Sequence, residues 1–60
     1  MNEYEFEYEG VMFGYTLDRG EYKPYGLYVI ETERDLDTTH GIGILVYEAA
    51  CEDVINRRAV

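Results

Sequence analysis

The sequence predicts an α+β fold: an antiparallel sheet of three or four strands with one C-terminal helix packed on a face. Three observations lead to this prediction. The start of the chain alternates apolar and polar residues as a strand does, glycine and proline interrupt that alternation, and only the last segment has helical spacing and charge. Because 60 residues suffice for one small core, we expect a single acidic α+β domain over residues 1–60.

The first strand is expected over residues 3–9, which read Glu-Tyr-Glu-Phe-Glu-Tyr-Glu. Neighbouring side chains of a strand point to opposite faces of the sheet. One face then carries Tyr4, Phe6 and Tyr8, and the other carries Glu3, Glu5, Glu7 and Glu9. A helix would scatter both sets around its surface, so we predict a strand.

The middle of the chain predicts two further strands. After Gly10 the alternation resumes on odd positions, at Val11, Phe13, Tyr15 and Leu17. Residues 18–21 (Asp-Arg-Gly-Glu) are a turn signal. Pro24 cannot donate to a strand ladder, so the third strand should follow it and cover Tyr25 to Thr32. Residues 33–40, which are rich in Asp and Thr, are expected to form a loop.

The last third of the chain allows two interpretations, a strand followed by a helix or one long helix. At about 100° per residue, Ile42, Leu45 and Val46 share one helix face, whereas Tyr47 and Val54 lie on nearly the opposite one. Two glycines in the first turn would also weaken a long helix. We therefore predict a fourth strand over residues 42–47 and a helix over residues 48–58, whose early acids and late arginines match the helix dipole.

Charge is the strongest compositional signal. Thirteen acidic and five basic residues give a formal net charge of −8. This balance opposes direct binding to nucleic acid or to an anionic membrane, and it favours a partner protein with a basic surface, of the nucleic-acid-binding kind. The acidity could instead serve solubility alone, or adaptation to high salt. With seven Tyr and a small core, a homodimer is a further expectation.

No catalytic, cofactor or metal site is expected, and the protein is not expected to be an enzyme. The one histidine, His40, lies in a polar segment, and the one cysteine, Cys51, lies among apolar helix residues. Asp35, Asp37 and His40 lack the spacing of a metal loop. Gly41 and Gly43 lack the third glycine of a phosphate-binding signature. A single cysteine, the absence of an apolar leader and the absence of a long apolar stretch indicate the cytoplasm.

Two features are candidate partner-binding sites. Alternate residues of a strand lie about 6.6 Å apart, so Glu3, Glu5, Glu7 and Glu9 would form a straight row of carboxylates. That interval is of the order of the separation between successive phosphates along one DNA strand. The same row could instead be a solvated edge that prevents sheet-to-sheet aggregation. Tyr22, Tyr25 and Tyr28 form the second candidate, an aromatic contact patch, which could equally be ordinary cross-strand packing.

Residues 21–30, Glu-Tyr-Lys-Pro-Tyr-Gly-Leu-Tyr-Val-Ile, resemble the last part of the phage uracil-DNA glycosylase inhibitor, and Val11, Met12 and Thr16 resemble its preceding strand. The N-terminal helical portion of that family is absent here, and the predicted C-terminal helix has no counterpart there. The resemblance implies an acidic antiparallel sheet that mimics DNA. The strand from Glu3 to Glu9 would take the role of the glutamate-bearing strand that enters the DNA groove of the enzyme.

Together these observations predict a small acidic inhibitor or regulator that binds a protein, in the manner of a phage DNA mimic that blocks a host nucleic-acid-handling protein. The alternative is a structural or assembly module that forms a homo-oligomer, whose acidity serves only solubility.

Overall fold

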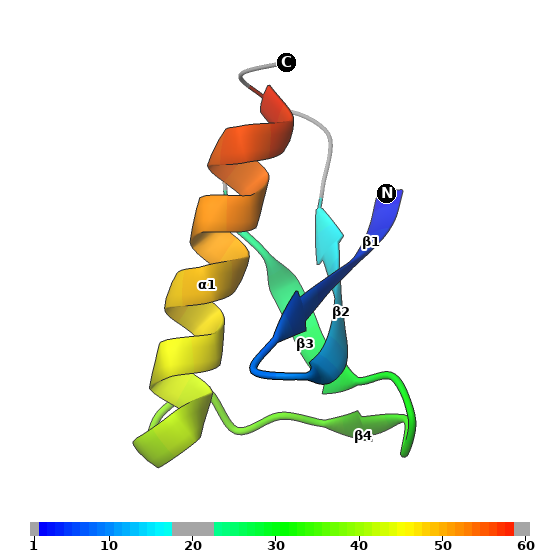
Figure 1. The fold of residues 1–60 in the computed structure, drawn as a ribbon, viewed down its shortest axis with the longest axis vertical. Coiled ribbons are helices and arrows are strands. Elements are labelled where there is room, and N and C mark those ends of the chain that lie inside the picture. The colour runs from blue at the N-terminus through cyan, green and yellow to red at the C-terminus, as the bar shows by residue number, and fades with distance from the viewer. Residues whose placement is uncertain (1, 18–22, 59–60) are drawn as a thin grey trace.

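The computed structural model describes residues 2–17 and 23–58, and it has the predicted α+β architecture (Figure 1). One helix lies against one face of a four-stranded antiparallel sheet. The elements in chain order are β1 (Asn2–Tyr8), β2 (Val11–Leu17), β3 (Tyr25–Val29), β4 (Arg34–Asp35) and α1 (Gly41–Arg58). The predicted turn at residues 18–21 lies outside the described residues.

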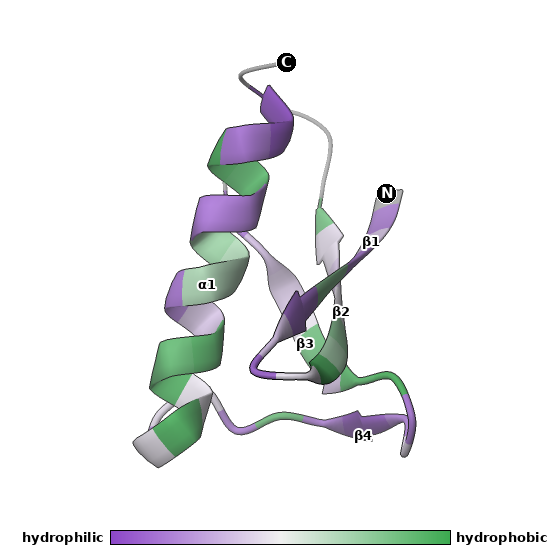
Figure 2. Cartoon of the chain, in the orientation of Figure 1, coloured by the Kyte–Doolittle hydropathy of each residue, from purple (hydrophilic) through white to green (hydrophobic). Residues whose placement is uncertain are grey.

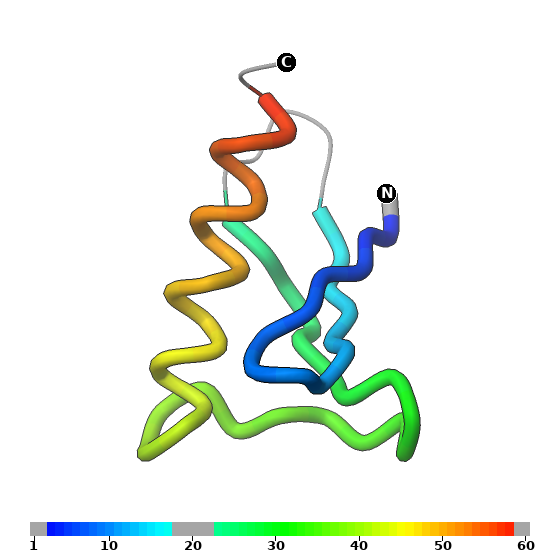
Figure 3. The backbone as a smooth tube through the Cα atoms, in the orientation of Figure 1, coloured from blue at the N-terminus to red at the C-terminus, as the bar shows by residue number. Residues whose placement is uncertain are grey.

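The sheet has the strand order β1-β2-β3-β4, so each strand pairs with its neighbour in sequence (Figure 3). Glu9 and Gly10 form the turn between β1 and β2, with φ values of 50° and 81°. Two positive φ values suit the right-handed twist of a hairpin, and glycine at the second position makes this turn accessible. Glu9 is therefore a turn residue, and the prediction that it belongs to the strand is wrong.

The pairing of β2 with β3 contains a bulge. Gly14 lies opposite Tyr28 and Thr16 lies opposite Tyr25, so β3 has one more residue than β2 across this interval. Gly26, with φ 58°, takes up the extra residue. The bulge interrupts the alternation along β3, and Tyr25 is exposed although Leu27 is buried.

β3 is shorter than predicted, because the chain turns after Val29. The Glu33 N–H donates to the Val29 carbonyl at 2.8 Å, and Glu33 has φ 57°. The chain then returns as β4, which pairs with the end of β3. The expected strand from Tyr25 to Thr32 thus ends at Val29, and the expected loop over residues 33–40 contains the short fourth strand.

The predicted strand over residues 42–47 is wrong, because α1 runs without interruption from Gly41 to Arg58. Its buried residues form a single stripe of small side chains: Gly43, Val46, Ala50 and Val54. The large residues that argued against one helix, among them Ile42 and Leu45, are exposed instead. The angular prediction assumed that the large apolar residues would all be buried, whereas only the stripe of small residues is buried and several large ones are exposed.

The core lies between the sheet and α1. Its buried members are Phe6, Phe13, Tyr15 and Leu27 from the sheet, and Val46, Ala50 and Val54 from the helix. The rings of Phe6 and Phe13 stack with centroids 5.8 Å apart across the paired strands. The predicted inward face of β1 is confirmed, since Phe6 is buried and Tyr4 and Tyr8 pack against the core.

Candidate protein-binding surface

The glutamates of β1 form the clearest surface feature. Glu3, Glu5 and Glu7 are exposed, and they alternate with the core-facing aromatic residues of the same strand. They therefore point from the face of the sheet opposite α1, which we call the outer face. We call these three residues the acid row. Glu9 is exposed in the adjoining turn.

The neighbours of the acid row on β2 carry no charge. Glu3 lies opposite Thr16, Glu5 opposite Gly14, and Glu7 opposite Met12. The ring of Tyr28 from β3 covers Gly14, because a Cβ atom placed on Gly14 would lie 2.6 Å from the Tyr28 Cζ atom. The outer face thus presents a line of carboxylates along one side with an aromatic ring next to it.

Of the three tyrosines predicted as a contact patch, the structure places one beside the acid row. Tyr28 is half-buried over Gly14, whose other neighbour is Glu5. Tyr25 is 45% exposed beyond the bulge. Tyr22 lies outside the described residues. The structure therefore brings Tyr28 and the acid row together on the outer face.

A polar cluster that the sequence analysis missed holds α1 to β1. The Tyr15 hydroxyl donates to Asp53 Oδ2 at 2.6 Å, and Arg57 Nε donates to the same oxygen at 2.6 Å. Arg57 Nη2 also donates to the Glu5 carbonyl at 2.9 Å, and the guanidinium lies 4.7 Å from the centre of the Tyr4 ring. The spacing of Asp53 and Arg57, four residues apart on a helix, was the only sequence signal for this cluster.

Burial of Tyr15 and its hydrogen bond to Asp53 raise the pKa of this phenol to about 12. The bond to Asp53 is also the main reason why the pKa of Arg57 is raised. Both groups therefore keep their protons well above neutral pH. The cluster fixes the backbone of β1 at Glu5, directly behind the acid row.

The segment before α1 contains a second polar network. Asp37 Oδ1 accepts from the Thr39 N–H at 2.9 Å and from the Thr39 hydroxyl at 2.5 Å. Asp37 Oδ2 lies 2.9 Å from His40 Nδ1. The Thr39 bonds are the main reason why the pKa of Asp37 is lowered. This is the geometry of an aspartate-stabilised turn that leads into a helix, and we assign the network that structural role.

Asp37 and His40, two of the residues considered for a metal, lie together in the network before α1, and Cys51 lies apart from them in the helix. In residues 2–17 and 23–58, no group of three His, Cys, Asp or Glu side chains could hold a metal ion. His40 is exposed before α1, and Cys51 is half-buried in the middle of that helix. Gly43 is in contact with the Asp37 backbone, so its role is close packing.

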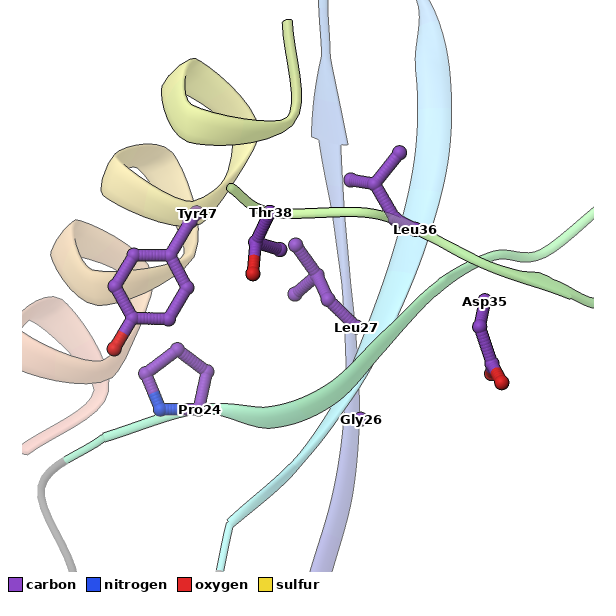
Figure 4. Close-up of a pocket in the computed structure, with 7 residues that line it drawn as sticks. All are labelled: Pro24, Gly26, Leu27, Asp35, Leu36, Thr38 and Tyr47. Carbon is purple, nitrogen blue, oxygen red and sulfur yellow. The ribbon is translucent and has the colours of Figure 1, made fainter. Parts of the chain in front are cut away.

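A shallow pocket of about 310 Å³ opens between β3, β4 and α1 (Figure 4). Tyr47 and Pro24 lie at one end of it, and Asp35 lies apart at the other. The pKa of Tyr47 is raised, mainly by burial and to a lesser extent by the neighbouring Cys51. Since its polar groups do not converge, the pocket lacks the arrangement of a small-molecule site.

No protein-family model, curated protein or solved structure matches this chain. The resemblance of residues 21–30 to the phage inhibitor therefore stays a prediction. In the described part of the chain, no helix is long and apolar enough to cross a membrane.

Proposed function

We propose that this chain is a small acidic inhibitor or regulator that binds a protein with a basic, nucleic-acid-binding surface, in the manner of a phage DNA mimic. The observation that supports this function best is the acid row on the outer face, where α1 does not cover the sheet. The chain acts by occupying its target.

The acid row is suited to an electrostatic interface. Its carboxylates project from a paired strand whose backbone the Arg57 hydrogen bond holds in place, so little backbone conformational freedom is lost on binding. A linear array of like charges attracts a basic groove at long range and raises the association rate. The net charge of −8 adds to that attraction.

The test begins with capture of targets from a bacterial lysate on the immobilised chain, followed by identification of proteins that duplex DNA displaces. The affinity of each target is then measured over a range of salt concentrations for the parent and for the variant Glu3→Gln, Glu5→Gln, Glu7→Gln. We expect weaker binding, slower association and a shallower salt dependence for the variant. Its stability should be equal or slightly higher, because like-charge repulsion is relieved.

A matched control separates the acid row from net charge. The variant Glu31→Gln, Glu48→Gln, Glu52→Gln removes the same charge from exposed positions elsewhere. If both triple variants weaken binding equally, only the total charge matters. If neither does and both remain folded, the acid row is not the interface.

One observation favours the alternative, a homo-oligomeric assembly module. The first turns of α1 expose Ile42, Ile44 and Leu45 by 60%, 42% and 50%. Figure 2 shows this end of the helix as strongly hydrophobic and its C-terminal half as mostly hydrophilic. Self-association through apolar residues would persist at high salt, whereas binding by the acid row would not.

A further inference from the structure

The free edge of β1 is a second feature of the acid-row strand. In the described part of the chain, β1 is seven residues long and ends the sheet on one side. The opposite edge, β4, has two residues. Long edges can accept an added strand from another chain, and short ones cannot. β1 is therefore the edge at which strand addition is possible.

The hydrogen-bond pattern shows which backbone groups of β1 face outward. The Ile30 N–H donates to the Met12 carbonyl at 3.1 Å, so the backbone groups of Met12 point to β3. These groups alternate along a strand, hence those of Phe13 point to β1 and those of its partner Phe6 point back to β2. By the same alternation, the outward N–H and C=O groups belong to Glu3, Glu5 and Glu7.

One cation of the chain already binds this edge. Arg57 reaches across 52 residues of sequence to donate to the outward Glu5 carbonyl, and its guanidinium lies over the Tyr4 ring. The edge thus binds a guanidinium through a backbone carbonyl, that of Glu5, and through an aromatic ring, that of Tyr4. A carbonyl oxygen has two lone pairs, so Glu5 can accept a further bond from a strand N–H.

From this geometry we propose that the edge of β1 binds an extended basic segment of the partner protein as an added strand. The proposal rests on the proposed function and adds the conformation and charge of the partner segment that binds. Residues of the segment opposite Glu3, Glu5 and Glu7 share the outer face with them and lie about 5 Å away. Arginine or lysine at every second position therefore pairs with the acid row, while the backbone completes the sheet.

The first experiment compares two variants at one position. Glu7→Gln removes the charge and keeps the outward N–H, whereas Glu7→Pro removes both, and proline is tolerated on the open side of an edge strand. The probe is a peptide as long as β1 that alternates arginine and threonine. We expect Glu7→Pro to bind it roughly two- to tenfold more weakly than Glu7→Gln, the effect of one lost hydrogen bond.

The second experiment leaves the protein unchanged, so its result tests the proposal even if Glu7→Pro fails to fold. Two further peptides are N-methylated at every second residue, one at the arginines and the other at the threonines. Both keep the charge, but only one of them loses the N–H groups that would pair with β1. We expect one methylated register to lose binding at least tenfold. On binding of the parent peptide, amide exchange at Glu3, Glu5 and Glu7 should slow, while that at Phe6, already paired with β2, should change little.

The outcomes separate this inference from the proposed function. If both methylated peptides bind like the parent peptide and exchange at the edge does not slow, strand addition is overturned. The proposed function then stands if the acid-row variant still loses affinity for the captured target. If the acid-row variant binds that target as the parent does, the proposed function fails whatever the peptides show.

Discussion

At the scale of single residues, the buried phenol of Tyr15 connects the core to the binding strand. Its ring is fully buried and its hydroxyl donates to Asp53, which also accepts from Arg57. Tyr15→Phe keeps the ring and removes that bond. We expect a loss of about 1–3 kcal/mol in the free energy of unfolding, measured by urea denaturation, because the acceptor is charged. A loss within experimental error would mean that water replaces the hydroxyl at no cost.

The same residue gives a pH dependence. An unfolded tyrosine has a pKa of about 10, whereas that of folded Tyr15 is about 12. The folded state therefore holds this proton more tightly, and the resulting stability is fully present below pH 10 and is lost as the pH rises toward 12. We expect urea midpoints to fall over this interval in the parent and to fall less in Tyr15→Phe. Parallel curves for the two proteins would contradict this assignment.

At the scale of elements, the start of α1 depends on Gly43. A Cβ atom there would lie 1.7 Å from the Asp37 carbonyl oxygen and 2.8 Å from its carbon, both backbone atoms. Alanine is the better helix former by about 1 kcal/mol, but relieving this overlap should cost more. We expect Gly43→Ala to lose about 1–3 kcal/mol of stability, as overpacking does.

The exposed position Glu48, five residues further along α1, provides the control. Glu48→Ala gains helix propensity without meeting a neighbour, so its thermal midpoint should equal or exceed that of the parent. If Gly43→Ala also raised the midpoint, the close contact between α1 and the Asp37 backbone would be wrong.

At the scale of the whole molecule, a chain of 60 residues has a small core and leaves an apolar end of α1 in solvent. We expect it to self-associate at micromolar concentration, with a sedimentation-equilibrium mass above the 7.0 kDa of one chain. Ile42→Ser with Leu45→Ser should restore the monomer, since both side chains are exposed and neither supports the core. A parent that sediments at 7.0 kDa throughout that range would exclude the dimer.

Interactions between residues close in sequence determined much of the fold of this protein. Period-two alternation specified β1, β2 and the core-facing side of Tyr4, Phe6 and Tyr8, because side-chain direction in a strand depends only on neighbouring residues. Pro24 marked the start of β3 for an equally local reason, its missing N–H. The exposure of the acid row followed from the same alternation.

Tertiary structure decided the rest. Residues 42–47 are helical because small residues, including Gly43, bring α1 close to the sheet and to the Asp37 backbone, and that fit depends on the shapes of distant segments. Strand order made β1 an edge, and only the folded chain brings Arg57 to the Glu5 carbonyl. The sequence by itself thus determined which residues are acidic and exposed, while the three-dimensional packing determined which backbone groups beside them are open to a partner.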